Sequence, residues 1–224
     1  MPEEEGWLSS FLTYLEFAWE HLVELGVEHA LVVIVSVAIA TAIGMGLGLA
    51  TYRKDRPREM ALAVTGTFLT IPSLALFGVF ISVPFLGLGT RSVVVGLVMY
   101  GLLPIVRNTI VGLREVDPAI VESAQGMGMG RMTRLFRIEL PLAWPVILTG
   151  MRVSTLILVG IAAIGAYING PGLGNDIFTG LARIGSASAL NLVLGGILGI
   201  MVLAVLFDLV YVLVSRVTVS KGLR

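Results

Sequence analysis

Residues 122–141 read ESAQGMGMGRMTRLFRIELP, a polar and basic stretch between two long apolar segments at 92–113 and 144–167. An apolar segment of roughly 20 residues is long enough to cross a bilayer as a helix. Inside the hydrocarbon the backbone must satisfy its own hydrogen bonds, which favours helices. The stretch therefore predicts an all-α, polytopic membrane protein in which 122–141 lies on one side of the membrane.

The composition agrees with a membrane protein. Of the 224 residues, 56% are hydrophobic and only 13% are charged, whereas a soluble domain carries about 25% charged residues. Cysteine is absent, which excludes disulfides and thiol chemistry. We expect five transmembrane helices, near 29–51, 62–83, 92–113, 144–167 and 190–215.

The basic residues predict the orientation of these helices. They gather in the loop after the first span, in the loop after the third and near the C-terminus, whereas the opposite loops hold only Arg91 and Arg183. The basic clusters are Arg53, Lys54, Arg56 and Arg58; Arg114, Arg131, Arg134 and Arg137; and Arg216, Lys221 and Arg224. Because basic loops remain in the cytoplasm, we expect the N-terminus outside and the C-terminus inside.

The same reasoning divides the chain into three parts. Residues 1–28 are expected to form an external amphipathic helix at the membrane interface, with an apolar stripe and glutamates at i, i+4 spacing. Two roles fit this helix, a simple anchor on the outer leaflet or a contact for an external partner. Residues 29–216 are expected to form the transmembrane domain with a cytoplasmic loop at 114–143, and 217–224 a cytoplasmic tail.

The loop itself predicts two short helices joined by a hinge. Asp117 is a good N-cap and Pro118 a good first helical residue. The first helix should end in the glycines of 126–130, and the second, over 131–139, should stop at Pro141, with Pro145 opening the next span. Such an arm either docks on a partner or simply shields the ends of the helices.

The spacing of residues in the loop resembles a family motif. The EAA loop of permease subunits of ATP-binding-cassette (ABC) importers reads Glu-Ala-Ala, three residues, Gly, nine residues, Ile-x-Leu-Pro. Every element is present here, with Ser123 in place of the first alanine. The resemblance implies an ATPase-coupling loop made by Glu122, Ser123, Ala124, Gly128, Leu135, Ile138, Leu140 and Pro141.

Three further stretches, at 70–75, 103–109 and 170–174, resemble the osmoprotectant branch of these permeases, which handles glycine betaine, choline or carnitine. The resemblance implies a type I importer permease fold in a prokaryotic cell (inner) membrane. It also implies two separate ABC ATPase subunits that bind ATP and Mg, a second permease copy or paralogue, and an external solute-binding protein. We expect contacts with membrane lipid and none with nucleic acid.

The chain offers no chemistry of its own. It has no G-x-x-x-x-G-K-[ST] phosphate loop, no catalytic set of residues and no metal-binding motif, so we expect neither an enzyme nor a cofactor. For His21 and His29 we expect a plain interfacial role. Two alternatives to an osmoprotectant importer stay open: an ABC importer of an amino acid or another small solute, and an ion-gradient-driven transporter or channel.

Polar and aromatic residues within the spans are the remaining candidates. Asp208 is expected to form a structural ion pair with Arg107 or Arg152, in preference to a direct role in transport. Pro72 interrupts a span, and its freed carbonyls either line a path or mark a packed kink. Aromatic faces attract quaternary ammonium groups but are also common interface anchors. The substrate-path candidates are Phe68, Thr70, Pro72, Ser73, Tyr100, Asn108 and Tyr167.

Overall fold

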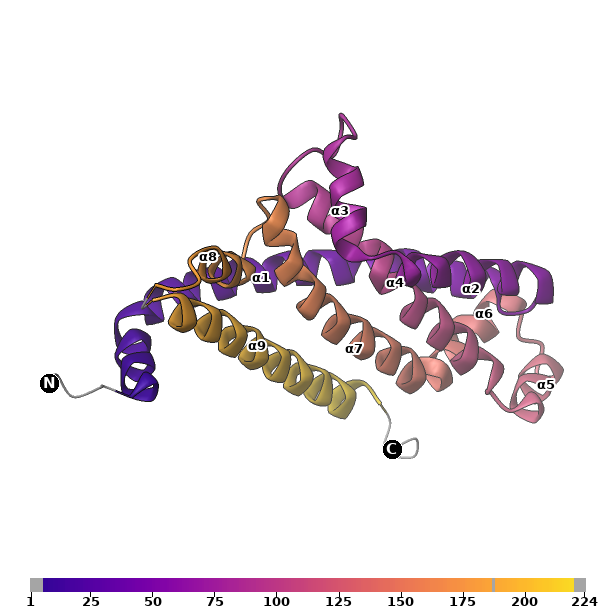
Figure 1. The fold of residues 1–224 in the computed structure, drawn as a ribbon. Coiled ribbons are helices and arrows are strands. Elements are labelled where there is room, and N and C mark those ends of the chain that lie inside the picture. Colours follow the sequence, from indigo (N-terminus) through magenta and orange to yellow (C-terminus); the bar gives the residue numbers. More distant parts are fainter. Residues whose placement is uncertain (1–5, 187, 220–224) are drawn as a thin grey trace, which may run out of the picture. The chain divides into compact units, whose positions relative to one another are not determined.

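The computed structural model describes residues 6–186 and 188–219, and within them every regular element is a helix (Figure 1). The elements are α1 (Trp7–Thr51), α2 (Asp55–Thr70), α3 (Ser73–Ile81), α4 (Thr90–Arg114), α5 (Pro118–Gly126), α6 (Arg131–Arg134), the π-helix η1 (Leu135–Glu139), α7 (Leu140–Ile164), the 3₁₀-helix η2 (Gly165–Ile168), α8 (Gly174–Ala182) and α9 (Ala189–Thr218). The predicted all-α fold class is confirmed. Lys221 and Arg224 of the predicted tail lie outside the described residues, as do residues 1–5.

Among the described residues, four helical stretches are long and apolar enough to cross a membrane: Trp7–Thr51, Thr90–Arg114, Arg131–Ile168 and Ala189–Thr218. A fifth candidate appears if α2 and α3 count together as one bent span. The multi-pass architecture therefore stands, although the helices do not begin and end where the sequence predicted.

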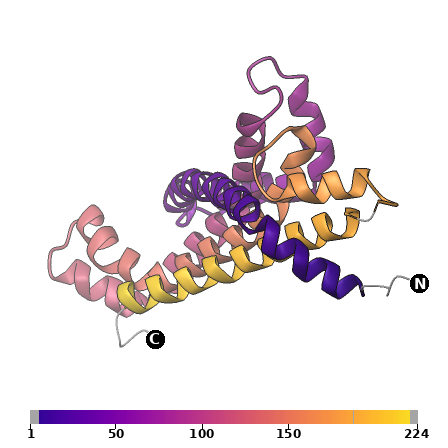
Figure 2. The same cartoon turned by 90° about the vertical axis from the view of Figure 1, so that its left-hand side faces the viewer.

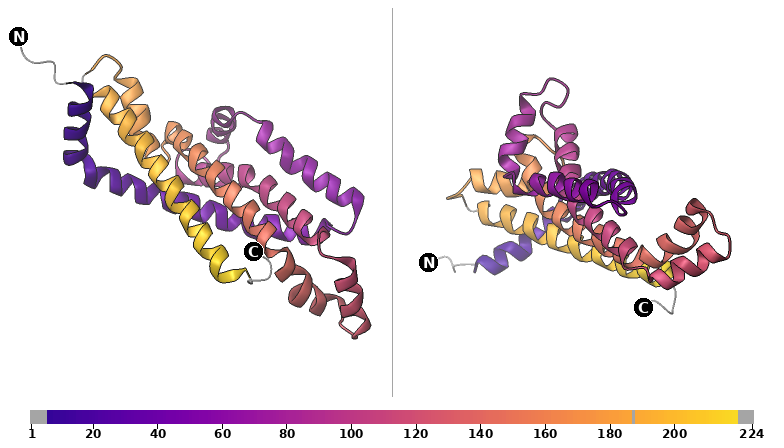
Figure 3. Two further views of the ribbon diagram at one scale, coloured as in Figure 1. Left: turned by 90° about the horizontal axis from the view of Figure 1, so that it is seen from below. Right: turned by 90° about the vertical axis from the view of Figure 1, so that its right-hand side faces the viewer.

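The first difference is at the N-terminus. The predicted interfacial helix and the predicted first span form one continuous helix, α1, of 45 residues. At 1.5 Å per residue this helix is about 68 Å long, roughly twice the hydrocarbon thickness of a bilayer. Nothing between the two predicted segments stops a helix, since Gly26 costs only about 1 kcal/mol there. The early turns of α1 bend away from the turns that follow them (Figure 3).

The second difference concerns the predicted span at 62–83, which is interrupted. The backbone leaves helical geometry at Ile71 (ψ 126°) and Pro72 (ψ 128°), between α2 and α3. Proline disfavours helical geometry in the residue before it and has no N–H to continue the ladder. The buried Tyr100 hydroxyl donates a 2.8 Å hydrogen bond to the Ile71 carbonyl that the break leaves free.

The chain forms two compact units, and α1, α4, α7 and α9 each contribute residues to both. The first unit comprises residues up to Ser36 with Pro72–Leu97 and Leu158–Leu206. In it α3 contacts η2, and the Gly89 amide donates a 2.7 Å hydrogen bond to the Ile168 carbonyl (Figure 2). The chain after η2 forms a further short helix, α8.

His29 belongs to this first unit and is fully buried, which corrects the interfacial role predicted for it. Its Nε2 lies 3.0 Å from the Val159 carbonyl oxygen, and a methyl group on Gly172 would lie 2.7 Å from its Cβ. His21 contacts the buried Asp176 carboxylate at 2.9 Å. Both histidines thus fasten α1 to elements from later in the chain.

The second unit comprises Val37–Ile71, Val98–Ile157 and the chain from Phe207. Its core is formed where α1, α4 and α7 meet, and its buried members are Tyr52, Val106, Ile110, Leu113, Ala143 and Ile147. Helices α1 and α4 approach closely at Gly48, where a methyl group in place of a glycine hydrogen would lie 2.5 Å from the Thr109 side chain. Small residues of this kind let membrane helices pack backbone to backbone. This unit carries the loop described next.

Candidate functional site: the loop between α4 and α7

The stretch 118–139 folds as a short helical arm within the second unit (Figures 1 and 3). Asp117 caps α5, as predicted, by accepting a 2.8 Å hydrogen bond from the Ala119 amide. The α5 helix ends at Gly126, and Gly128 reverses the chain with φ +81°, a value that L-residues rarely adopt. The predicted helix, hinge and second helix are all present.

The second helix does not end where the sequence predicted. From Arg131 the chain continues without a break through α6, η1 and α7, so Pro141 stops no helix and Pro145 lies inside α7. The Leu140 amide donates to the Leu135 carbonyl, which is the i→i+5 bond of a π-helix. Pro141 follows directly and has no N–H to donate, so the helix type changes beside the proline while the helix itself continues.

The residues of the EAA-like motif divide into an exposed and a buried group. Glu122, Ser123 and Gly128 are exposed. Ala124 is buried, and Leu135 and Leu140 pack against the core of the unit. Large apolar side chains also face outward on this arm: Ile120, Met127, Met132 and Phe136. An exposed apolar surface beside arginines is typical of a docking site for another protein.

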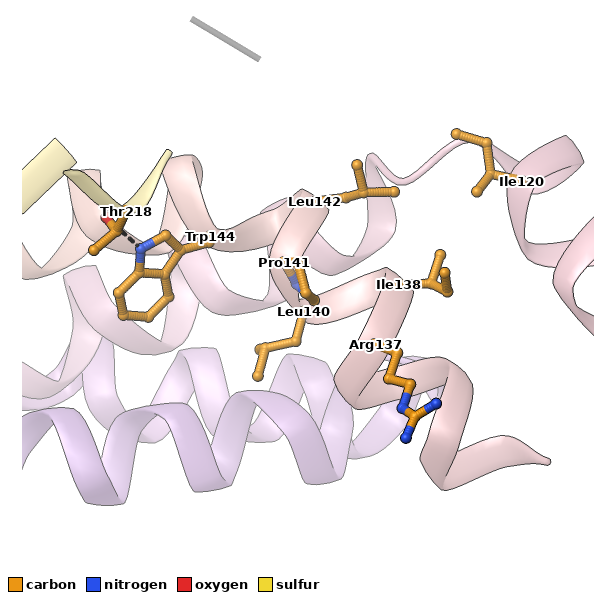
Figure 4. Close-up of a pocket in the computed structure, with 8 residues that line it drawn as sticks. All are labelled: Ile120, Arg137, Ile138, Leu140, Pro141, Leu142, Trp144 and Thr218. Atoms are coloured by element: carbon orange, nitrogen blue, oxygen red, sulfur yellow. Dashed lines mark hydrogen bonds between the residues drawn. The ribbon is translucent and has the colours of Figure 1, made fainter. Parts of the chain in front are cut away.

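An apolar groove of about 630 Å³ runs beside the arm (Figure 4). Its lining includes Ile120 from α5, Ile138 from η1 and Leu142 from α7. Trp144 also lines the groove and donates a 2.9 Å hydrogen bond to the Thr218 hydroxyl. The Ile-x-Leu-Pro end of the motif lines this groove through Ile138, Leu140 and Pro141. The groove and the outward apolar residues together form the candidate docking surface.

Glu139 organises the base of the arm, and the sequence did not single it out. The residue is only 2% exposed. It accepts hydrogen bonds from the Tyr52 hydroxyl at 2.8 Å, from Arg53 Nη2 at 2.9 and 3.1 Å, and from Arg134 Nε at 2.9 Å. Burial raises the pKa of the Tyr52 phenol, and the hydrogen bond to Glu139 raises it further, whereas Arg53 lowers it. The phenol therefore stays protonated and donates.

The substrate-path candidates differ in their surroundings. Tyr100 is buried, and its hydroxyl donates a hydrogen bond to the Ile71 carbonyl at the α2–α3 break. Tyr167 is largely exposed. Thr70 and Pro72 are exposed on either side of that break. The Asn108 side chain donates a 2.8 Å hydrogen bond to the Pro104 carbonyl of its own helix. Phe68 and Ser73 are half-buried.

One of the two predicted partners of Asp208 is present. Arg152 Nε and Nη2 donate to the two Asp208 oxygens at 2.5 and 2.7 Å, a bidentate pair between α7 and α9. Arg107 is exposed and makes no contact with Asp208. In the part of the chain that the structure describes, no three acidic, histidine or cysteine side chains gather where they could hold a metal ion.

Several apolar membrane helices joined by a basic helical arm define the permease subunit of a transporter. The chain belongs to the family of binding-protein-dependent transport system inner membrane components, whose model matches residues 40–219. It is a multi-pass transport component and not an enzyme. Membership in this family identifies the chain as the permease of an ATP-driven importer, which argues against the gradient-driven alternative.

Curated relatives agree with this assignment, and a solved structure agrees with the fold. The chain is 32% identical over 217 residues to the glycine betaine/carnitine/choline transport system permease protein OpuCB of Bacillus subtilis, covering 97% of each chain. It is 39% identical over 165 residues to the carnitine transport permease protein OpuCD of Listeria monocytogenes, covering 73% of this chain and 71% of that one. A chain of the inward-facing MetNI methionine ABC transporter matches with a TM-score of 0.73 at 22% identity, covering 89% and 96%, and shows the same fold.

Proposed function

We propose that this permease imports small osmoprotectants of the glycine betaine, choline and carnitine type. The names of the relatives carry the proposal, because permeases for these three solutes match most of the chain. The stretches at 70–75, 103–109 and 170–174 point to the same branch. An importer of an amino acid or another small solute is the alternative, and the solute-binding partner distinguishes the two.

ATP and Mg would be bound by two separate ATPase subunits, and each would dock on the arm 118–139 of one permease copy. Support comes from the exposed apolar residues of α5, α6 and η1 and from the groove lined by Ile138 and Pro141. A second copy of this chain or a paralogue would complete the path across the membrane. An external binding protein would deliver the solute to the side where the N-terminus lies.

Within the transmembrane domain, 29–216, the proposed solute contacts are Phe68, Thr70 and Asn108 in the second unit and Pro72, Ser73 and Tyr167 in the first. Support comes from the non-helical backbone at Ile71 and Pro72, because irregular backbone at membrane depth is tolerated where it is buried in protein or lines a water-filled cavity. Tyr100 would shape this path indirectly, since it is buried behind the break.

Purification of the tagged chain from its native membrane in mild detergent tests the docking arm. The wild type is expected to bring down an ATPase, and Gly128→Trp is expected to lose it, because Gly128 has φ +81° and a side chain there distorts the arm. Gly185→Trp is the matched control. Gly185 also has a positive φ of 98° and open space around it, but it lies in the loop between α8 and α9.

Recovery of the ATPase with the wild type and with Gly185→Trp, and its loss with Gly128→Trp, would support the docking arm. Equal recovery with all three proteins would contradict it. The solute-binding protein recovered in the same preparation can then be titrated with glycine betaine, choline, carnitine and methionine. Binding of methionine in preference to the other three would replace the osmoprotectant proposal with the amino-acid alternative.

A further inference from the structure

Glu139 joins two separate segments of the second unit through one buried carboxylate, and its partner Arg134 links a third. Tyr52 and Arg53 follow the end of α1, Arg134 ends α6, and Glu139 itself ends η1 immediately before α7. Arg134 also donates from Nη1 to the Gln125 side-chain oxygen at 3.1 Å, which adds α5 to the network. No other carboxylate among the described residues is both this buried and bonded to two arginines.

The π-helix explains why these groups meet. Arg134 and Glu139 are five residues apart, and in an α-helix two such residues point in different directions. The i→i+5 bonds of η1 bring them onto one face, where Arg134 Nε and Glu139 Oε1 are 2.9 Å apart. A π-helical turn is less stable than an α-helical one and is frequently found at functional sites.

A buried carboxylate needs charged and hydrogen-bonding partners, because the charge alone is costly to remove from water. Glu139 has both: two guanidinium groups and a phenol use both of its oxygens. Loss of the negative charge would leave the largely buried Arg134 guanidinium without its ion-pair partner. The network therefore fixes the base of the arm relative to α1, while the exposed residues of the arm remain available to a partner protein.

We propose that Glu139 is a positioning residue for energy coupling: it fastens the arm to the end of α1, so that movement of the arm on a docked ATPase is passed to the first membrane helix as well as to α7. This inference rests on the proposed docking of an ATPase on the arm. Glu139 is buried and lies at the base of the arm, so its role is transmission and not contact with the ATPase.

The test uses the complete transporter, reconstituted in liposomes with its ATPase and binding protein. Solute uptake and ATP hydrolysis are measured together for the wild type, Glu139→Gln and the control Glu59→Gln. The control makes the same chemical change at an exposed carboxylate in α2 of the same unit. For Glu139→Gln we expect the amount of co-purified ATPase to stay unchanged and the uptake per ATP to fall about 5- to 150-fold, the usual range of coupling between two sites.

Two further variants keep the test decisive if Glu139→Gln does not accumulate. Arg53→Gln and Tyr52→Phe each remove one link to α1 and leave the pair between Arg134 and Glu139 in place. Both are expected to lower uptake per ATP without loss of the ATPase, and Arg53→Lys is expected to restore part of it. Wild-type uptake per ATP in these variants, or a fall that only follows loss of bound ATPase, would overturn the positioning role. A wild type that binds no ATPase would instead contradict the proposed function.

Discussion

The ion pair between Arg152 and Asp208 is a residue-scale feature with a direct consequence for stability. The two side chains meet in a bidentate geometry between α7 and α9. We expect Asp208→Asn to lower the yield and thermal stability of the purified permease, by about 1–2 kcal/mol for a polar contact between membrane helices. Solute selectivity should change little. Thermal unfolding in detergent and competition uptake assays measure the two effects.

Arg152→Lys provides the comparison for this prediction, because lysine keeps the charge but loses the planar fork that makes two parallel hydrogen bonds. It is expected to reduce stability less than Asp208→Asn does. Normal yield combined with altered selectivity in Asp208→Asn would instead assign Asp208 to the transport path.

Asp208 and Glu139, two of the acids in the second unit, show what a sequence can reveal at this scale. Asp208 could be singled out because a charge within an apolar span needs a partner, and the two arginines predicted near its level included the right one. Glu139 could not, because it lies in a stretch rich in arginines where an exposed glutamate is equally common. Its burial depends on the π-helical register and on Tyr52, which is 87 residues away in the chain.

At the scale of elements, the hydrogen bond from Tyr100 to Ile71 supports the interruption between α2 and α3. Tyr100 is 2% exposed, and its hydroxyl satisfies a carbonyl that the helix cannot use. Tyr100→Phe is therefore expected to destabilise the protein by about 1–3 kcal/mol, the cost of a buried polar group left without a partner. The apparent KM for the solute should stay near the wild-type value.

Tyr167→Phe is the matched control, because Tyr167 is largely exposed. It should unfold at the wild-type temperature. A Tyr100→Phe protein of normal stability but weakened uptake would return Tyr100 to the group of direct solute contacts.

The elements also show which structural features the sequence could predict. Long apolar segments predicted the existence of the membrane helices, and Asp117 with Pro118 predicted the start of α5, since both signals are local. The ends were harder: the predicted boundary after residue 28 is absent, Pro141 does not stop a helix, and Pro145 does not open one. A glycine or proline is tolerated within a membrane helix when neighbouring groups and local changes in helix type compensate for it, and these lie outside the local sequence.

At the scale of the whole molecule, the orientation in the membrane is a prediction from the basic loops, and the absence of cysteine makes it directly testable. Ile184, between α8 and α9, and Met127, between α5 and α6, are both strongly exposed. A cysteine at either position is accessible to a maleimide that cannot cross membranes. Ile184→Cys should react when the reagent is added outside intact cells, whereas Met127→Cys should react only after the membrane is permeabilised.

The cysteine-free parent gives the background labelling for both variants. The expected pattern follows from the arginines at 131, 134 and 137, because basic residues beside membrane spans stay in the cytoplasm. Labelling of Met127→Cys in intact cells would place the arm 118–139 outside, away from the ATP that drives import. An arm in that position could not dock a cytoplasmic ATPase, so the same experiment that fixes the orientation also tests the physical basis of coupling.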